Sequence, residues 1–345
     1  MKPTVPVSIV GFAGCTSLGY SVTATLAAMG AGLTNFTDTG IKNLFDTPAA
    51  AGALLDPEMP RMERLTTLTR VGLADLHLLL SMLRVEHAPF MVGLAADLSG
   101  DEHAALEREV LDSALVRPAA AWFPAGRASS FIALAHATEL VSRGAHRCIV
   151  VGGVDSLCAP ETVNRLVVAE RVLGPHVEGT IPGEAAMFAL IARGDDPIVD
   201  PAFAVGIDAV VQGRAAVSIL NADRVSGDGL AATFRALRQD GLRRVDRVVA
   251  AHSGEGYFGH CFSHAYLREV EIMPEPLRVD LTADTVGDIG AATGMLALAF
   301  ASYIMVSEAS GVPARVLAYS ESDTGEIGAA IIEGSPTSWQ RHLAG

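Results

Sequence analysis

The sequence predicts an α/β protein built from two duplicated halves, and three observations support this fold class. Strand-like apolar runs alternate with helical segments along the 345 residues. Two runs, at residues 147–153 and 184–193, are continuously apolar, as in strands that are buried on both faces of a sheet. One small-residue helical segment occurs twice, as SSFIALAHATEL from Ser129 and as TGMLALAFASYI from Thr293. Such a repeat indicates two similar layers that pack against each other, with a site at their junction.

The first half opens with a strand, a turn and a helix. Residues 5–12 form an apolar run, interpreted as a strand that ends at Gly14, and residues 17–32 show a helical pattern that closes on glycine. Residues 40–62 are rich in Pro, Ala and Asp without a strong period, so we expect an excursion over the surface. The elements expected beyond it are a helix over 65–83, a strand and turn over 91–100, and an acidic amphipathic helix over 102–115.

The middle of the chain carries the turn PAGRASS, residues 124–130, which leads into the first copy of the repeated helix. We expect mostly loop between the two continuously apolar strands, and Gly-Asp-Asp-Pro at 194–197 is the best linker candidate. The alternation of strand and helix resumes at Ala204, and VVGGVDSL followed by GEAAMFALIAR is similar to the later VLAYSESD followed by GEIGAAIIEG. We therefore divide the chain into halves at 1–195 and 196–345.

Charge and hydropathy exclude several classes of function. A net charge of −14 and a pI near 5.1, without a cluster of Lys and Arg, argue against a nucleic-acid partner. The most apolar late segment, residues 295–306, is too short to span a bilayer, so we expect no membrane association. The apolar run near the N-terminus is short and strand-like rather than a secretion signal. We expect a cytoplasmic protein.

The four cysteines, Cys15, Cys148, Cys158 and Cys261, show neither a CxxC pair nor the spacing of a disulfide framework. This pattern indicates reduced thiols. Cys148 lies in an apolar strand and is expected to be an inert core residue. Cys158 and Cys261 are expected in loops and are candidates for reactive thiols, although neither lies at a nucleophile motif.

Arg127 lies in the turn at the start of the repeated helix. Many acyl-transfer enzymes place a cysteine or serine nucleophile at such a turn, where backbone N–H groups and the helix dipole stabilise negative charge. A permanent cation opposes that dipole, and its burial without a partner costs about several kcal/mol. The sequence therefore calls for a compensating anion beside Arg127.

Five segments follow one another along nearly the whole chain: VSIVGFAGCTSLGYSVTATLAAMGAG, the block from RASS to ELVSRGAHRCIVVGGVDS, PGEAAMFALIAR, VVAAHSGEG and GDIGAATGMLALAFAS. Together they resemble the β-ketoacyl-acyl-carrier-protein synthases of the thiolase superfamily. The resemblance implies a thiolase-like, five-layered αβαβα fold of two duplicated halves, usually a homodimer. It also implies a Claisen condensation, in which a cysteine takes up an acyl group and two histidines assist decarboxylation of a malonyl unit and attack on the thioester.

The resemblance assigns active-site positions that this chain fills unusually. Counted back from SRGAHRCIVVGG, the nucleophilic cysteine falls on Arg127, whose guanidinium cannot form a thioester. His252, in AHSGEG, matches the first histidine. The second histidine is absent, and its position falls on Gly287 or Asp288, while the expected lysine is missing near Ala283.

The glycine-rich loop that the resemblance places near the C-terminus is replaced by residues 320–326, Ser-Glu-Ser-Asp-Thr-Gly-Glu. Three carboxylates in this loop oppose the stabilisation of a developing oxyanion. We expect Arg127 to pair with a carboxylate from the other half, Asp288 first and Asp323 or Glu326 second. Alternatively, Arg127 binds the carboxylate or phosphate of a ligand, such as a carrier-protein or coenzyme A arm, or is a partly exposed turn residue without a role.

These departures indicate a degenerate synthase without condensing activity, acting as a partner subunit or a binding scaffold. Two alternatives stay open: a decarboxylase or acyltransferase that uses His252 without an acyl-enzyme, and an adaptor for an unrelated pathway. The partners expected are a second copy or an active homologue in a dimer, and an acyl carrier protein.

His252, His260, Cys261 and His264 lie close together in sequence, but no second pair of ligands accompanies them, so we expect no metal and no other cofactor.

Overall fold

Helices and strands alternate through the computed structural model, which describes residues 5–113, 115–200, 205–221, 224–238, 243–307 and 314–334. The helices are α1 (Val22–Gly30), α2 (Arg61–Met82), α3 (Gly100–Asp112), α4 (Ser129–Ser142), α5 (Pro160–Val168), α6 (Asp228–Leu237), α7 (Gly256–Arg268), α8 (Ala283–Val286) and α9 (Thr293–Ser307). The strands are β1 (Val7–Thr16), β2 (Thr37–Lys42), β3 (Pro48–Ala51), β4 (Ala88–Leu94), β5 (Val116–Pro124), β6 (Cys148–Ser156), β7 (Glu184–Arg193), β8 (Val205–Arg214), β9 (Arg247–Ala250), β10 (Val279–Leu281), β11 (Ala314–Glu321) and β12 (Glu326–Gly334).

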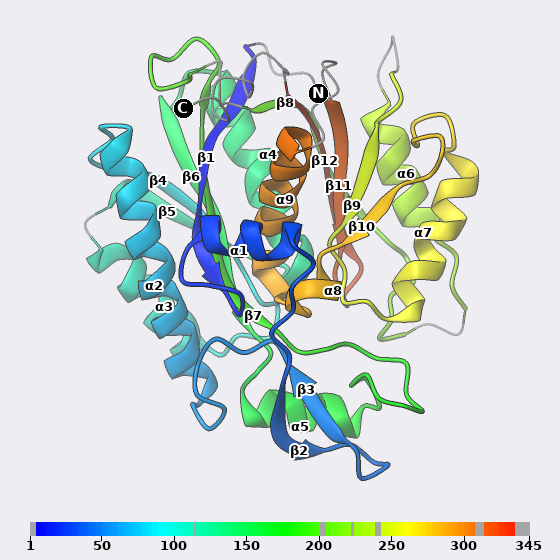
Figure 1. The fold of residues 1–345 in the computed structure, drawn as a ribbon. Coiled ribbons are helices and arrows are strands. Elements are labelled where there is room, and N and C mark those ends of the chain that lie inside the picture. The colour runs from blue at the N-terminus through cyan, green and yellow to red at the C-terminus, as the bar shows by residue number, and fades with distance from the viewer. Residues whose placement is uncertain are drawn as a thin grey trace.

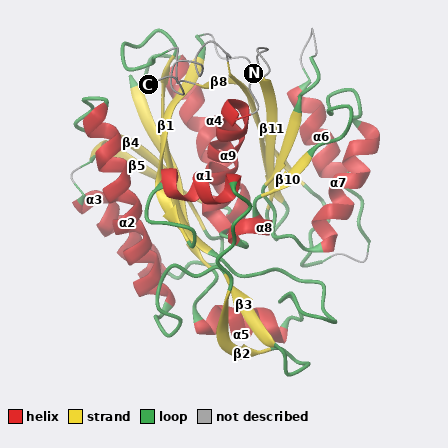
Figure 2. Cartoon of the chain, in the orientation of Figure 1, coloured by secondary structure: helices red, strands yellow, loops and turns green. Residues whose placement is uncertain are grey.

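The elements form five layers, helix, sheet, helix, sheet and helix (Figures 1 and 2). Helices α2 and α3 cover one outer face, α6 and α7 cover the other, and α4 and α9 lie between the two halves of the sheet. Three hydrophobic clusters fill the spaces between the layers: one surrounds the central helices α4 and α9, and one lies under each outer pair of helices. The α/β fold class predicted from the sequence, with its thiolase-like layers, is confirmed.

The strands of the large sheet show the duplication most clearly. Within the described residues the order is β10-β9-β11-β12-β8-β1-β7-β6-β4-β5. In the N-terminal half β7 pairs antiparallel with β1 and with β6, and β4 pairs parallel with β6 and with β5. In the C-terminal half β12 pairs antiparallel with β8 and with β11, and β9 pairs parallel with β11 and with β10. The two first strands, β1 and β8, join the halves through a short antiparallel ladder centred on Ser8 and Gly206.

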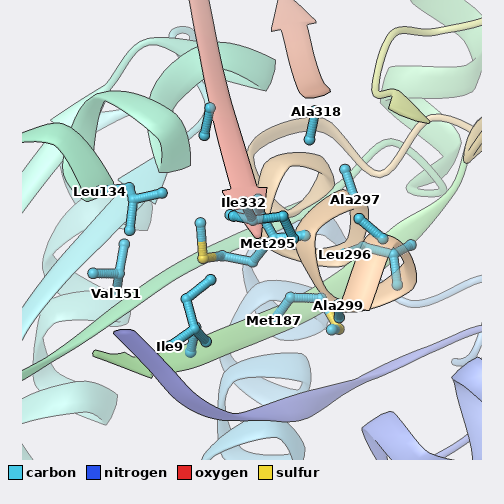
Figure 3. Packing of buried hydrophobic residues seen from close by; sticks show 14 of the residues in the cluster. Ile9, Leu134, Val151, Met187, Met295, Leu296, Ala297, Ala299, Ala318 and Ile332 are labelled. Atoms are coloured by element: carbon cyan, nitrogen blue, oxygen red, sulfur yellow. The ribbon is translucent and has the colours of Figure 1, made fainter. Parts of the chain in front are cut away.

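The repeated helices predicted from the sequence are α4 and α9. Each follows a three-residue 3-10 turn, η1 (Gly126–Ala128) before α4 and η2 (Gly290–Ala292) before α9. The small residues let the two helices approach closely, since a Cβ built on Gly294 would lie 2.5 Å from the Ser130 Oγ. Figure 3 shows the resulting core, in which Leu134 of α4 and Met295 of α9 pack with side chains from strands of both halves. A fully buried leucine contributes about 1.5–3 kcal/mol, so this layer is a large stabilising element.

Three local predictions need correction. The excursion at 40–62 contains β3 and the end of β2, which form a small antiparallel sheet, and the predicted loop between β6 and β7 contains α5. Strands β2 and β3 are short and largely exposed, and α5 is amphipathic but spans only nine residues, so none of them gives a long periodic signal in the sequence. Strand β1 continues to Thr16 rather than ending at Gly14, and α1 begins at Val22 with the Ser21 hydroxyl as its cap.

The described residues contain no helix that is both long and apolar enough to cross a bilayer. Strand β7 ends at Arg193 and β8 begins at Val205, so the duplicated strand sets fall on either side of the linker candidate at 194–197. The boundary between residues 195 and 196 stays a prediction.

Candidate functional site

The site begins at the turn before α4. Gly126 takes a positive φ of 60°, which favours glycine, and this conformation turns the chain so that Arg127 points inward with a relative exposure of 6%. The Ala128 N–H donates to the Ser322 hydroxyl at 2.9 Å, across the junction between the halves. Ser322 lies in the turn between β11 and β12, so the C-terminal half caps the start of α4.

Arg127 is held by carboxylates of the C-terminal half. Its Nη1 donates to the Asp288 Oδ2 at 2.7 Å, its Nη2 donates to Asp323, and its Nε donates to the Glu321 carbonyl at 3.1 Å. The predicted pairing with Asp288 and Asp323 is confirmed. The prediction for Glu326 is wrong, because Glu326 lies directly opposite Arg214 on the neighbouring strand and pairs with it at 2.7 Å.

Asp288 is positioned by its own backbone. Its N–H donates to the Ile181 carbonyl at 2.8 Å, and its carbonyl accepts from the Gly183 N–H at 2.9 Å. The preceding Gly287 has a φ of 76°, and a Cβ there would lie 2.5 Å from the Ile181 oxygen. The Asp288 carboxylate also accepts from the Gly290 N–H at 3.0 Å. Gly287 therefore shapes the chain, and the side chain that reaches the site at this position is that of Asp288.

A second arginine extends the cluster. Arg171, in the loop after α5, donates to the Asp323 Oδ2 at 2.6 Å and binds Glu255 through two hydrogen bonds of 2.7 and 2.6 Å. The result is a chain of alternating charge that runs Glu255, Arg171, Asp323, Arg127, Asp288, and we call it the five-residue ion chain. Sequence reasoning missed Arg171 and Glu255, because neither belongs to a charge pattern, although Glu255 lies within the quoted HSGEG segment.

His252 follows β9 and is buried beside the ion chain, with its ring stacked on Phe258 at 5.8 Å between centroids. The guanidinium of Arg127 lies 4.8 Å from the same Phe258 ring. The His252 Nδ1 accepts from the Gly254 N–H at 3.1 Å, which assigns the ring proton to Nε2. Burial, together with the charge of Arg127, lowers the pKa of His252 to about 3. His252 is therefore a neutral hydrogen-bond donor at physiological pH.

Burial and neighbouring charges shift the pKa values of the groups in the five-residue ion chain. The nearby carboxylates raise the pKa of Arg127 against the effect of its burial, so the guanidinium stays charged. The two arginines lower the pKa of Asp323, although burial acts in the opposite direction. Burial raises the pKa of Asp288, and Arg127 opposes that shift. Positive charge thus fills the turn where an acyl-transfer enzyme needs a nucleophile.

None of the four cysteines lies in the turn before α4. All four thiols are buried and unbridged. Burial raises the pKa of Cys15 and of Cys261 to about 12, and it also raises the pKa of Cys148 and Cys158. Cys158 lies in a loop as predicted, between β6 and α5, whereas the loop predicted for Cys261 is wrong because this residue lies within α7. Because a thiol reacts as its thiolate, burial disfavours the reactivity expected of both.

The histidine-rich segment does not assemble a metal site. Among the described residues, no group of three or more His, Cys, Asp and Glu side chains is arranged to hold a metal ion. Cys261 faces the outer hydrophobic cluster, while the exposed His264 lies 3.2 Å from the Ser226 carbonyl. His260, Cys261 and His264 are close in sequence because they lie along one helix, α7, whereas His252 precedes this helix.

Comparisons with solved structures show which known fold the chain has. The sequence matches no family model and no curated protein. Solved structures match nearly the whole chain: the ketosynthase ApeO in complex with its chain length factor ApeC from Xenorhabdus doucetiae gives a TM-score of 0.72 at 14% identity, over 96% of this chain and 98% of the other. The fold is that of the ketosynthases.

Two further structures agree with this likeness. The ishigamide ketosynthase/chain length factor matches with a TM-score of 0.70 at 15% identity, over 96% of this chain and 99% of the other. The ketosynthase from module 6 of the bacillaene synthase from Bacillus subtilis 168 matches with a TM-score of 0.70 at 13% identity, over 95% of this chain and 72% of the other. At such identities the likeness concerns the fold, and the roles of Arg127, His252 and Asp288 stay predictions.

Proposed function

We propose that this chain is a ketosynthase-like subunit without condensing activity that pairs with an active homologous ketosynthase. The observation that carries the proposal is the ion chain at the start of α4. Arg127 occupies the position that the sequence resemblance assigns to the nucleophile, and its side chain is already bound to Asp288 and Asp323. A guanidinium in this state cannot accept an acyl group.

The groups around the turn before α4 also argue against an acyl-enzyme. An acyl-enzyme forms through an anionic tetrahedral intermediate, which needs N–H donors and no fixed negative charge nearby. Here Asp288 and Asp323 lie against the turn, and Ser322 takes the Ala128 N–H. The site therefore binds its own side chains in place of an acyl thioester.

A partner role is supported by the neighbours and by the sheet. Two of the matched structures contain a chain length factor together with a ketosynthase. Among the described residues, strand β5 lies at one end of the large sheet and pairs with β4 alone. An unpaired strand edge is a ready template for pairing with another chain, so this edge suits an interface with a homologue.

His252 supports the second candidate, a decarboxylase or acyltransferase that forms no acyl-enzyme. Its neutral ring holds the proton on Nε2, and such a group can donate to a developing oxyanion. It cannot act as the general base, because Nδ1 already accepts a hydrogen bond and Nε2 carries the proton. The second candidate therefore has one oxyanion donor without a base, and the adaptor role is supported by no particular contact.

Co-expression tests the partner role. The chain, carrying an affinity tag, is expressed with the ketosynthase encoded nearest to it in its genome, and the purified complex is analysed by light scattering. We expect a 1:1 complex whose condensing activity depends on the ketosynthase alone. A ketosynthase from an unrelated gene cluster is the control. Absence of a complex with the neighbouring ketosynthase would refute the partner role.

A further inference from the structure

The C-terminal half of the large sheet ends in an edge strand of its own. Among the described residues β10 pairs with β9 alone, just as β5 pairs with β4 alone in the N-terminal half. The duplication therefore gives the chain two sheet edges, and the partner role proposed above uses only that of β5. An unpaired edge presents a row of backbone N–H and C=O groups to another chain.

The hydrogen bonds to β9 show which backbone groups of β10 point the other way. The Val248 N–H donates to the Arg278 carbonyl at 3.0 Å, and the Thr282 N–H donates to the last residue of β9 at 3.2 Å. Successive residues of a strand direct their backbone groups to opposite edges. Val279 and Leu281 therefore direct their N–H and C=O groups away from β9, toward the outer edge of the sheet.

The side chains beside this edge are apolar and half exposed. Leu281 packs against the outer hydrophobic cluster that contains Phe262 and Ala265 of α7. Val279 comes two residues earlier, so its side chain lies on the same face of the strand, and it is 41% exposed. Leu277, just before the strand, is 42% exposed. An incoming strand with apolar side chains on this face would bury them against Val279 and Leu277.

The carboxylates of this edge already have counter-charges. Asp280, whose side chain lies on the other face of β10, accepts two N–H groups from Arg247, one of them at 2.6 Å. Glu275, before the strand, pairs with Arg244. An occupant therefore needs no charge of its own to match these carboxylates, and burying a charge costs more than burying a neutral residue. The edge thus fits an uncharged segment.

Only an extended backbone matches this arrangement of donors and acceptors. Alternate residues of a strand repeat every ~6.6 Å, so a second strand meets the outward groups of Val279 and Leu281 in register. A helix uses its backbone groups internally and cannot pair with them. Because β10 spans only three residues, the added strand makes few hydrogen bonds, and we expect weak, reversible binding.

We propose that the outer edge of β10 binds an extended, uncharged segment of a partner protein, which adds a strand to the large sheet. The backbone of this segment pairs with Val279 and Leu281, and its alternate apolar side chains lie beside Val279 and Leu277. The inference goes beyond the partner role, because β10 and β5 lie at opposite ends of the sheet. A strand docked on β10 therefore leaves the β5 edge available to a ketosynthase.

Fluorescence anisotropy with a labelled peptide, Ser-Val-Thr-Val-Thr-Val-Ser, tests the edge. Two matched peptides carry backbone N-methyl groups either on the valines or on the threonines, so each lacks the N–H groups of one edge. We expect the native chain to bind the unmodified peptide and one methylated peptide with similar affinity, and to bind the other about tenfold more weakly. The peptide that binds weakly shows in which direction the added strand runs.

Substitutions in the chain test the same contact. Val279→Pro removes an N–H group that points away from β9, so the pairing of β10 with β9 stays while the affinity for the unmodified peptide should fall about tenfold. Val279→Lys should have a similar effect, because it places a charge beside an uncharged segment. Val270→Lys is the matched control and should leave the affinity unchanged, because Val270 is 46% exposed against 41% for Val279 and lies in the turn after α7.

Four results would overturn the proposal. A native chain that does not bind the unmodified peptide shows that the edge takes no strand. Equal binding of both methylated peptides shows that backbone pairing plays no part. Equal effects of Val279→Lys and Val270→Lys place the peptide elsewhere. Self-association of the native chain that Val279→Lys abolishes assigns the edge to a second copy. No ketosynthase is present in these measurements, so each result is independent of the partner role.

Discussion

Replacing Arg127 tests whether the ion chain stabilises the junction between the halves. In Arg127→Met the apolar stem stays and the guanidinium is lost, which leaves the Asp288 carboxylate, 1% exposed, without its counter-charge. Asp323 keeps Arg171. Removing one partner of a buried ion pair typically costs about 3–5 kcal/mol, so we expect the free energy of unfolding at pH 7.5 to fall by about that amount.

The pH dependence of this loss identifies its cause. Without Arg127, burial and the carboxylates of Asp323 and Glu255 raise the pKa of Asp288 further, with only the Gly290 N–H opposing them, so more of the group is protonated at pH 5 than at pH 7.5. The variant should therefore recover part of its stability relative to the native protein at pH 5. The double variant Arg127→Met/Asp288→Asn removes the stranded charge, and it should lose less stability at pH 7.5 than Arg127→Met alone.

Urea unfolding followed by far-UV circular dichroism measures these differences for the native protein, both single variants and the double variant. The reasoning is refuted if Arg127→Met stays within about 0.5 kcal/mol of the native protein at both pH values, the range of ordinary surface substitutions. Additive effects of the two single substitutions would equally contradict it, since paired groups must show coupling.

Two further predictions concern Glu321 and Gly287. Burial raises the pKa of Glu321 from 4.5 to about 7. Between these values the folded chain holds a proton that the unfolded chain releases, so the free energy of unfolding falls as the pH rises. Urea titrations at pH 4.5 and 8 should show the native protein losing about 3 kcal/mol relative to Glu321→Gln, and an equal change of stability with pH in the two proteins would contradict this. Gly287→Ala should destabilise the chain by more than about 1 kcal/mol, because Gly287 has a positive φ and its added Cβ would approach the Ile181 oxygen. Gly259→Ala, in α7 with no atom within 4 Å of its added Cβ, should stabilise the chain by about 0.5–1 kcal/mol. Thermal melts compare the two variants, and equal effects would refute the argument from backbone conformation.

The fold could be predicted because its strongest signals are long and periodic. The α4 and α9 segments carry the same small residues, and their matching 3-10 turns follow from that duplication. The continuously apolar strands β6 and β7 are buried at almost every position, as expected for strands covered on both faces. Strands β2 and β3 and helix α5 were not predicted, because all three are short and many of their side chains are exposed.

The site could be predicted in part. A cation at the start of α4 requires an anion, and the duplication places the turn before α9 beside it, which is why the pairing of Arg127 with Asp288 could be anticipated. Arg171 and Glu255 could not be found in the same way. They come from a loop and a helix cap that only the tertiary structure brings together, and an isolated charge in a loop is ordinarily solvated.

A condensation assay tests the central claim most directly. The native chain, His252→Ala and Arg127→Cys are incubated with acetyl- and malonyl-acyl carrier protein, and both the products and the intact chain are analysed by mass spectrometry, with an active ketosynthase as the positive control. The account predicts no β-ketoacyl product, no decarboxylation and no acyl adduct on the native chain. A product or decarboxylation that the native chain supports and His252→Ala abolishes would contradict it and make His252 a catalytic residue.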